Sequence, residues 1–504
     1  MLKLKLENFY KYFFYLFVFL IPFQSRKVFL TDYSFYTGDF TEYGTIFLYI
    51  SDVIFLLSIV FLLVFNRGLI KNGLSELKNS SNNRTRLNAA YFIVALTVWF
   101  FINTLLNQGV FSISLFRSLK ITEMFFLVAF ILITFKNRKF LLSSLFTLLM
   151  SAYFQSIIAI YQFIYQNSLF SSSLLHKLSG ETVLSSDLPG IAKIVSENGE
   201  RLIRSYGVFP HPNILGGFLV FSIFLSMFLY REHKDSYLSS NAFSGIGKNK
   251  RFKKGLISLF WIVIFLSQFL SMFFSFSRSA WIAFFVGVVV FLIFSYKSIR
   301  IVSRETIRSV LIKNREILLA FFLFISFIFI NSSLLIGRVF QDVSKNEQNN
   351  AQNNAQNIYL PENDTFSDRN FFNIVSRETI SEKFITGSGP GSAVFQIKPY
   401  VDKNYRGVQL ESWQIQPTHN FFLLLFSEVG VIGFILFLGI IFYCIKYSFQ
   451  KIVSRETILE DKFLKVSLIS IFVGFVFIGF FDHYFWTIQQ GQIIFWMVIG
   501  LLLV

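Results

Sequence analysis

The amino-acid sequence predicts an all-α polytopic membrane protein that forms a single domain over residues 1–504. Hydrophobic residues make up 54% of the chain and charged residues only 15%, whereas soluble domains carry roughly 25% charged residues. The apolar residues fall into blocks of about 18–25 residues, the length of a membrane-spanning helix. Short polar loops separate most of these blocks, so the pattern differs from the amphipathic periodicity of a soluble core.

Hydropathy predicts about twelve membrane spans. Their approximate cores are 8–24, 45–65, 88–106, 119–135, 140–164, 213–230, 256–274, 280–296, 317–336, 420–445, 464–481 and 489–504. No small-residue cleavage site follows the first block, so we expect it to remain as an uncleaved membrane helix.

Basic loops predict the orientation of the chain. Connections rich in lysine and arginine are 66–87, 136–139, 231–254, 297–316 and 446–463. They all lie on one side if the chain starts there, and cytoplasmic loops are enriched in such residues. We therefore expect an inner (cytoplasmic) membrane protein with both termini in the cytoplasm. The same enrichment accounts for the net charge of +17 without a nucleic-acid partner, because no soluble basic domain is present.

Two long loops, about 165–211 and 337–419, are predicted on the external side. Loops longer than about 12–15 residues are usually functional or disordered. The second loop, predicted between spans nine and ten, is expected to be partly helical. It contains an Asn/Gln-rich stretch at 346–357, which we interpret as a disordered insertion.

The heptapeptide Ile-Val-Ser-Arg-Glu-Thr-Ile occurs at 301–307, 374–380 and 452–458. The predicted topology places the second copy outside and the other two in the cytoplasm, which argues against a shared binding role. One hypothesis is a function in the DNA, because the central residues can be encoded by a palindrome similar to the sites bound by chromosome-partition proteins. The alternative is a mobile repeat inserted in frame. Unrelated codons in the three copies would exclude the DNA hypothesis, and neither hypothesis assigns the peptide a role in activity.

Several polar residues stand where apolar blocks meet external loops, and ionisable groups there are functional candidates by default. Arg204, His211 and Asn213 precede or open a predicted helix that starts near Pro212. Helix N-termini attract anions, and a guanidinium group is suited to binding phosphate. The alternative is an interfacial arginine whose stem lies along apolar surface.

A second candidate is Ser277-Arg278, in a very short loop between two spans. An external arginine runs against the usual charge bias of membrane proteins, although an ordinary interfacial arginine would also explain it. A third motif, Gly387-Ser-Gly389-Pro-Gly391, is typical of a turn. It lacks the lysine of a phosphate-binding loop, so we do not expect nucleotide binding.

The fourth candidate is His419-Asn420, at the predicted external mouth of span ten. A neutral imidazole can remove a proton from a hydroxyl group, although an interfacial histidine is more often structural. We expect no external carboxylate to be as well placed, because Glu428 lies inside the predicted span. The sequence holds no Cys/His cluster with metal-ligand spacing, and the single Cys444 cannot form an intrachain disulfide.

Taken in order, these motifs resemble the O-antigen ligase and polymerase superfamily. The matching residues are Arg204…Gly207-x-Phe209-x-His211-Pro212-Asn213, Ser277-Arg278-Ser279-Ala280, Gly387-x-Gly389-x-Gly391, His419-Asn420-x-x-Leu423…Glu428-x-Gly430-x-x-Gly433, Trp486-Thr487 and Phe495-Trp496. The similarity is best over about 200–440, which would form the ligase-like core. The Asn/Gln-rich stretch and the second heptapeptide lengthen the external loop before the glycine motif, which is a departure from the family pattern.

The resemblance implies an integral-membrane glycosyltransferase with a similar number of helices and an active site on the external, periplasmic face. Such enzymes move a glycan from an undecaprenyl-diphosphate carrier to an acceptor, with inversion and without a metal or other cofactor. Carried over by position, Arg204 and Arg278 would bind the donor diphosphate and His419 would act as the base. The supporting residues would be His211, Asn213, Ser277, Gly389, Asn420 and Arg369.

The acceptor separates the alternatives within the superfamily. A ligase uses a lipid-linked core such as that of lipopolysaccharide, and a polymerase uses a second carrier-linked chain. We rank these surface-polysaccharide functions above protein O-oligosaccharyl transfer. A polysaccharide or anion transporter is the alternative from another class. Transporters place charge at mid-membrane between inverted repeats, whereas the candidate residues here lie at the outer mouth and the sequence shows no matching half-repeat.

Overall fold

The computed structural model describes residues 6–504 apart from 80–83, 171–172, 187, 189, 196–199, 242–247, 303–314, 334–364, 404–409, 411–414 and 455–456. Apart from helices and loops, the described chain contains two short antiparallel strand pairs, β1 (Arg26–Phe29) with β2 (Ile46–Tyr49) and β3 (Lys193–Val195) with β4 (Arg201–Ile203). The predicted all-α class is confirmed. The Asn/Gln-rich stretch at 346–357 lies outside the described residues.

Each predicted span core coincides with one helix. These helices are α2 (Phe9–Leu20), α3 (Ile50–Phe65), α5 (Arg84–Leu106), α6 (Phe111–Thr134), α7 (Arg138–Tyr165), α9 (Pro212–Asn241), α10 (Lys248–Phe274), α11 (Arg278–Val302), α13 (Arg315–Ile330), α17 (Phe421–Val453), α18 (Leu459–Gly479) and α20 (Gln489–Leu502). The additional elements are α4 (Arg67–Asn79), α8 (Ser173–Ser179), α15 (Thr365–Glu382), α16 (Ala393–Asp402), α19 (Tyr484–Thr487), η1 (Glu42–Gly44) and η3 (Gln108–Val110).

Seven of the described helices are long and apolar enough to cross a membrane, and an eighth span results if α3 and α4, bent by 91°, are counted as one. Helices α2 and α20 are apolar but shorter. Helix α6 is long, but Arg117, Lys120 and Glu123 interrupt its apolar surface. The protein is therefore a multi-span membrane protein, and the predicted number of twelve spans is not confirmed.

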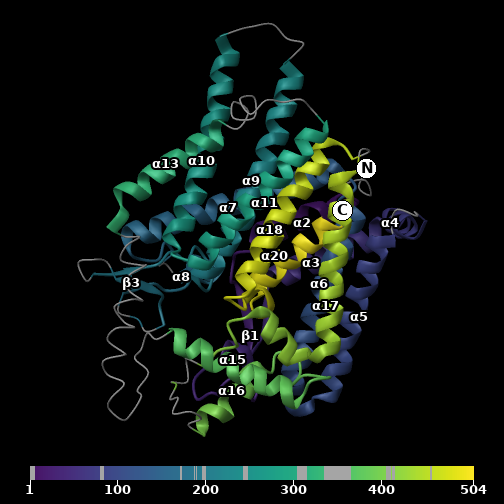
Figure 1. Cartoon of the computed structure of the whole chain (residues 1–504), viewed down its shortest axis with the longest axis vertical. Helices are drawn as coiled ribbons and strands as arrows, with labels where there is room; N and C mark the ends of the chain where they lie inside the picture. The colour runs from purple at the N-terminus through teal and green to yellow at the C-terminus, as the bar shows by residue number, and fades with distance from the viewer. Residues whose placement is uncertain are drawn as a thin grey trace.

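Several connections predicted as basic loops are partly helical instead. Helix α9 continues to Asn241 and α10 starts at Lys248, inside the predicted loop 231–254. Lysine, arginine and glutamate favour helix, so the helical backbone continues past the end of the apolar block. Figure 1 shows these extensions as a helix pair at the top of the molecule.

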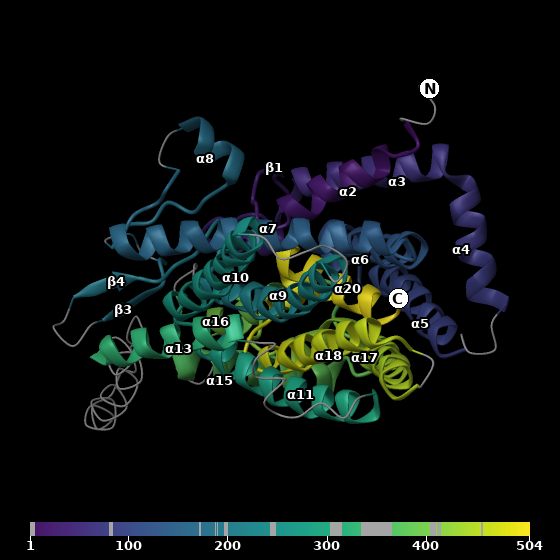
Figure 2. The same cartoon turned by 90° about the horizontal axis from the view of Figure 1, so that it is seen from above.

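Helix α9 lies at the centre of the bundle. It contacts α7, α10, α11 and α18, and Figure 2 shows it between these neighbours. Phe218, Phe221 and Phe224 are fully buried along it. The buried Ser222 hydroxyl donates to Gln268 Oε1 on α10 at 2.7 Å, a polar contact of the kind that joins helices within a membrane. The N-terminus of α9, with its polar residues, is thereby held inside the bundle at one end.

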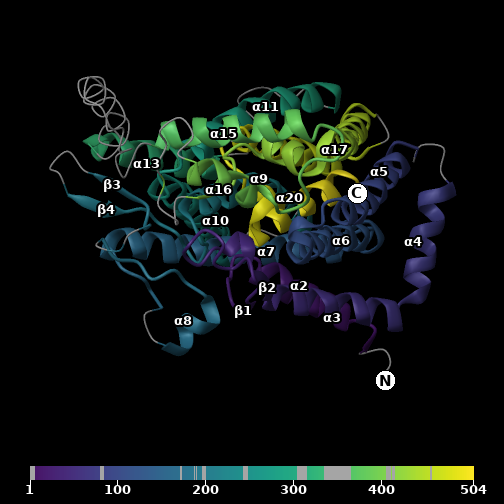
Figure 3. The same cartoon turned by 90° about the horizontal axis from the view of Figure 1, so that it is seen from below.

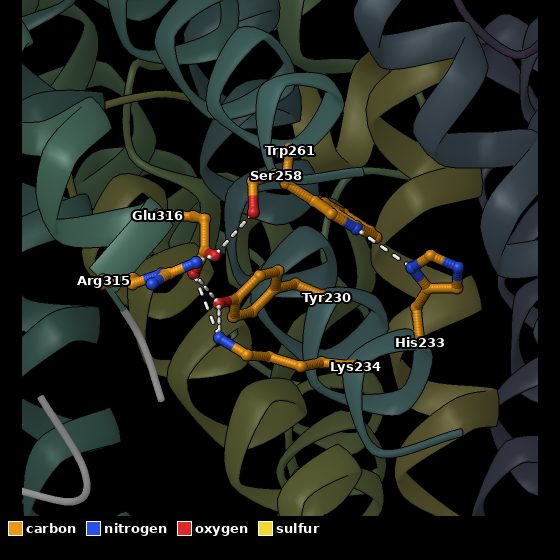
Figure 4. A network of polar contacts seen from close by, with 7 residues as sticks. All are labelled: Tyr230, His233, Lys234, Ser258, Trp261, Arg315 and Glu316. Carbon is orange, nitrogen blue, oxygen red and sulfur yellow. Dashed lines mark hydrogen bonds and ion pairs between the residues drawn. The ribbon is translucent and has the colours of Figure 1, made fainter. Parts of the chain in front are cut away.

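A polar network joins α9 to α10 and α13, far from the start of α9. Glu316 accepts hydrogen bonds from Tyr230, Lys234 and Ser258, while the Trp261 indole donates to His233 Nδ1 at 3.3 Å. Figure 4 shows these side chains between α9, α10 and α13. Tyr230 lies 18 residues beyond Pro212, roughly 27 Å along a helix, so this network is separate from the residues at the start of α9.

Helix α17 is broken at Gly430, whose φ of 65° and ψ of −174° are not helical. A break leaves carbonyl groups without helical partners, and buried carbonyls must find others. Here Ser388 N and Gly389 N donate to the carbonyls of Ser427 and Glu428, each at 2.9 Å. The indole of Trp99 donates to the carbonyl of Val429 at 2.8 Å.

The segment Gly387–Gly391 is therefore the partner of the α17 break, and we call it the glycine clasp. Gly387, Gly389 and Gly391 all have positive φ. A Cβ on Gly387 would lie 2.5 Å from the Glu428 backbone, which only glycine avoids. The turn predicted for this motif is confirmed, and its backbone bonds with the α17 break.

We expect Gly430→Ala to destabilise the protein by roughly 2 kcal/mol or more, because this backbone conformation is essentially restricted to glycine. The added Cβ would also meet the Ile385 carbonyl oxygen at 2.2 Å. Thermal unfolding in detergent micelles measures the effect. Gly68→Ala is the matched control, since nothing lies within 4 Å of its added Cβ. Equal unfolding temperatures for the two variants would contradict the proposed role of the break.

Candidate functional site

His419, Asp482 and His483 meet where α17 begins and α18 ends. The rings of His419 and His483 lie 4.9 Å apart between centroids. One side-chain ligand atom from each of the three residues lies within 4.8 Å of the others. Asp482 and His483 are buried, whereas His419 is partly exposed. We call these three residues the histidine cluster.

The loop before α17 is fixed on both sides of His419. Asn420 caps α17 by accepting a hydrogen bond from Leu423 N at 3.0 Å, and its amide reaches the Phe480 carbonyl at 3.4 Å. Thr418 donates to the Phe372 carbonyl on α15 at 3.0 Å. Helix α15 lies with α16 at one end of the bundle (Figures 1 and 3). Asn420 therefore acts as a helix cap that also joins the two loops of the cluster.

The second heptapeptide copy forms part of the same support. It lies within α15, where Val375 and Ser376 are buried. The hydroxyl of Ser376 is hydrogen-bonded to that of Thr418, next to His419. The copy thus contributes to packing around the histidine cluster, a structural role that the repeat pattern did not indicate.

A chain of hydrogen bonds connects Arg204 to the cluster. The Arg204 guanidinium donates to Asn213 Oδ1 at 2.6 Å, and the Asn213 amide donates to Asp482 Oδ2 at 2.9 Å. His211 Nδ1 accepts from Asn213 N at 3.2 Å. The start of α9 at Pro212 is as predicted. Three of the predicted site residues, Arg204, His211 and Asn213, therefore lie together beside the cluster.

Arg204 also joins this group to the turn before α11. Its Nε donates to the Ser275 carbonyl at 2.8 Å, and its side chain is buried. Ser277 is buried in the same turn, with its hydroxyl 3.3 Å from that of Ser279. Arg278 begins α11 immediately after Ser277, and its side chain is exposed. Arg204 is thus connected to the cluster through hydrogen bonds, and Arg278 begins α11 directly after the turn that Arg204 contacts.

Asp482 is the acidic partner of the surrounding histidines. Burial alone would raise its pKa, but the nearby imidazoles of His483, His419 and His211 and the hydrogen bond from Asn213 lower the pKa of this carboxyl instead. An ionised carboxylate in this position can stabilise an imidazolium ion.

The histidines themselves favour the neutral form. Burial, together with the charge of neighbouring His483, brings the pKa of His419 well below its usual value, while Asp482 acts in the opposite direction. Burial and the nearby Arg204 lower the pKa of His211 to about 3. Arg369, on α15, also lowers the pKa of His419, His211 and His483. A neutral imidazole can accept a proton.

Gly389 lies elsewhere. It is part of the glycine clasp and is packed against Asn107 and Ser114, so its support for the site is indirect. The clasp reaches the cluster through Glu428, whose carboxylate accepts from Trp486 Nε1 at 2.8 Å and from Ala393 N at 3.3 Å. Trp486 follows His483 in the short helix α19. The broken helix α17 thereby positions both loops that form the histidine cluster, the one before α17 and the one before α19.

Sequence reasoning overlooked Asp482. The expectation that no external carboxylate would be as well placed as His419 is wrong, because the fold brings Asp482 to the histidines across more than sixty residues of sequence. Its position directly before His483, in a loop after an apolar block, was the available signal.

Arg117 is a second residue that the sequence motifs did not indicate. It lies on α6, donates to the Thr487 carbonyl at 2.9 Å, and acts electrostatically on His483. Its Nε is buried and has no hydrogen-bond partner among the described residues. Gly391 leaves room for it, since a Cβ there would lie 2.7 Å from Arg117 Cγ.

The histidine cluster offers the ligand types of a metal site, namely two imidazoles and a carboxylate. Ligand spacing in the sequence could not indicate this set, because its members come from separate loops. Asp482 already accepts hydrogen bonds from Asn213 Nδ2 and from the backbone N–H of His483, and His483 Nδ1 lies 2.7 Å from the Thr487 hydroxyl. The arrangement equally suits a hydrogen-bonded acid–base group.

Residues 261–438 match the family model described as O-Antigen ligase. The match includes Arg278, the glycine clasp and His419, whereas Arg204 and Asp482 lie outside it. No curated protein matches the chain. This match to an O-antigen ligase domain confirms, over these residues, the resemblance to the O-antigen ligase and polymerase superfamily that the motifs indicate. This domain supports glycan transfer of the O-antigen ligase type at a membrane.

Proposed function

We propose that this protein transfers a glycan from an undecaprenyl-diphosphate carrier to an acceptor hydroxyl group on the external face of the inner membrane. The observation that carries the proposal is the histidine cluster, in which a neutral histidine, His419, stands beside an ionised carboxylate. His419 lies within the residues that match the O-antigen ligase family. Both termini would lie in the cytoplasm, because the basic loops share the side on which the chain begins.

His419 acts as the general base in this proposal. It is the partly exposed member of the cluster, and its Nδ1 is buried without a hydrogen-bond partner among the described residues. It removes the proton from the acceptor hydroxyl as that oxygen attacks the anomeric carbon. The imidazolium that forms is stabilised by Asp482. Attack from the face opposite the leaving group inverts the configuration.

Arg204 and Arg278 bind the donor diphosphate. The leaving group gains negative charge as the glycosidic bond breaks, and guanidinium groups can hold phosphate oxygens with two hydrogen bonds. Arg204 is already oriented by Asn213 and Ser275, whereas Arg278 is exposed at the start of α11. We propose that the pair supplies this charge without a metal ion.

The acceptor determines whether the reaction is ligation, polymerisation or protein glycosylation, and residues outside the histidine cluster would select it. We place ligation or polymerisation of a surface polysaccharide first. Transfer to a protein hydroxyl uses the same base and the same leaving group and is the second candidate. A transporter would need an alternating path through the bundle, whereas the cluster lies at one end of α9 and α17.

Replacing His419 with alanine should reduce glycan transfer by roughly 100-fold or more, the usual contribution of a general base. The measurement is transfer from a synthetic undecaprenyl-diphosphate glycan by purified, folded protein, in the presence of a metal chelator. Donor binding should persist in the variant. Unchanged turnover would remove His419 from its assigned role, and loss of wild-type turnover on chelation would contradict a metal-independent reaction.

Replacing Arg278 with lysine should reduce kcat/KM for the donor by roughly tenfold or more, since lysine keeps the charge but lacks the planar fork. The matched control is Arg315→Lys, because Arg315 lies in the network at the far end of α9 (Figure 4). If the two lysine variants transfer glycan equally well, Arg278 does not contact the donor.

Replacing Asp482 with asparagine should slow transfer and move the acidic limb of the pH–rate profile to lower pH. The base is competent only above the pKa of His419, and Asp482 raises that pKa. Removal of the carboxylate therefore keeps His419 neutral to lower pH but leaves the imidazolium formed in the reaction without its counter-charge. Asp461→Asn is the control, since Asp461 pairs with Arg138 at the opposite end of α18. An acidic limb that stays in place would contradict the coupling.

A further inference from the structure

A separate cavity of about 410 Å³ lies between the first external loop, the α5–α6 connection and α16. Its volume is in the range of small-molecule sites, about 300–1,000 Å³. Three aromatic residues line it, Tyr33, Tyr36 and Phe395, together with the amide side chains of Asn107, Gln108 and Gln396. None of these residues belongs to the histidine cluster.

The aromatic wall of this cavity is held rigidly. The rings of Tyr33 and Tyr36 stand edge-on to Phe395, with centroids 5.2 and 5.0 Å away. The Tyr33 hydroxyl donates to the Gly109 carbonyl at 2.9 Å. Within the loop, Thr41 N donates to the Ser34 carbonyl at 2.8 Å. These contacts hold the rings in place before binding, which lowers the entropy lost when a ligand binds.

The polar wall suits hydroxyl groups. An amide side chain offers both donors and acceptors, and a sugar hydroxyl needs both. Asn107 Nδ2 donates to Asn103 Oδ1 at 3.1 Å, which orients its amide. Lys383 also lines the cavity, and no carboxylate does so among the described residues. Aromatic faces combined with fixed amides provide apolar contact and hydrogen bonds in one site.

The glycine clasp and the start of α16 lie between the cavity and Arg117. Ser388 and Phe395 line the cavity, while Gly391, between them in sequence, packs against Arg117. Arg117 in turn acts on His483. A glycan chain whose end reaches His419 could therefore extend past the glycine clasp toward this cavity.

We propose that the cavity binds a saccharide unit of the glycan, neutral or acidic, at a distance from the bond being formed. This inference rests on the proposed function. The competing explanation for exposed aromatic residues in this loop is anchoring at the membrane interface. Phe40 tests that explanation, because it is 45% exposed on the same loop, packs on Phe35, and does not line the cavity.

The experiment measures binding rather than turnover, in the His419→Ala background. The ligands are the undecaprenyl-diphosphate glycan isolated from membranes of the source cells and the same carrier bearing one sugar. Tyr36→Ala and Gln396→Ala are compared with Phe40→Ala, each confirmed as folded by thermal unfolding. Tyr36→Ala should weaken binding of the full glycan about tenfold, and Gln396→Ala should also weaken it. Phe40→Ala should not, and the one-sugar carrier should bind all variants equally.

Equal binding of the full glycan by the Tyr36 and Phe40 variants would overturn the inference. An equal loss for the one-sugar carrier would also overturn it, because the cavity would then not be a remote subsite. Failure of the proposed function gives a different result, namely full transfer activity in the single variant His419→Ala. The two outcomes are independent, since glycan binding is measured without turnover.

Discussion

The break in α17 is the constraint on which the rest of the site depends. The break at Gly430 leaves carbonyl groups of a buried helix without helical partners, and each unpaired group in an apolar interior is costly. The glycine clasp and Trp99 supply the missing donors. Because the clasp belongs to the long loop between α13 and α17, satisfying the broken helix also fixes that loop on the bundle. His419 at the start of α17 and Asp482 before α19 are positioned by the same set of contacts through Glu428.

The histidine cluster combines residues from segments with different structural requirements. Helix α9 brings His211 and Asn213 because it packs between α7, α10, α11 and α18, and α15 brings Arg369 because Phe371 and Phe372 pack in a small separate core. Among the described residues, Asp482 is the buried carboxylate that meets these imidazoles. Its removal from water is tolerable only because hydrogen bonds and imidazoles surround it. The site is thus a consequence of packing at one end of the bundle.

Much of the fold could be predicted from the sequence, because the length of an apolar block directly reflects the helix that contains it. The start of α9 at Pro212 and the turn at Gly387–Gly391 also followed from local chemistry. The partnership of Asp482 with His419 could not be predicted, since no local pattern connects two loops that meet only after folding. Arg117 could not be predicted for the same reason. The helical extensions of α9 and α10 were not predicted because hydropathy detects apolar segments and does not distinguish a polar helix from a polar loop.

Two of the three identical heptapeptides, those at 374–380 and 452–458, have different environments in the described part of the chain. In α15 the copy at 374–380 places Val375 and Ser376 in the interior beside Thr418, whereas in the copy at 452–458 α17 ends at Val453 and Ser454 is its C-terminal cap. If the copies are kept identical, the same residues must suit both the interior of a helix and the end of another helix. Where sequence drift separates them, the copy in α15 has the least freedom, since its side chains support the loop of His419.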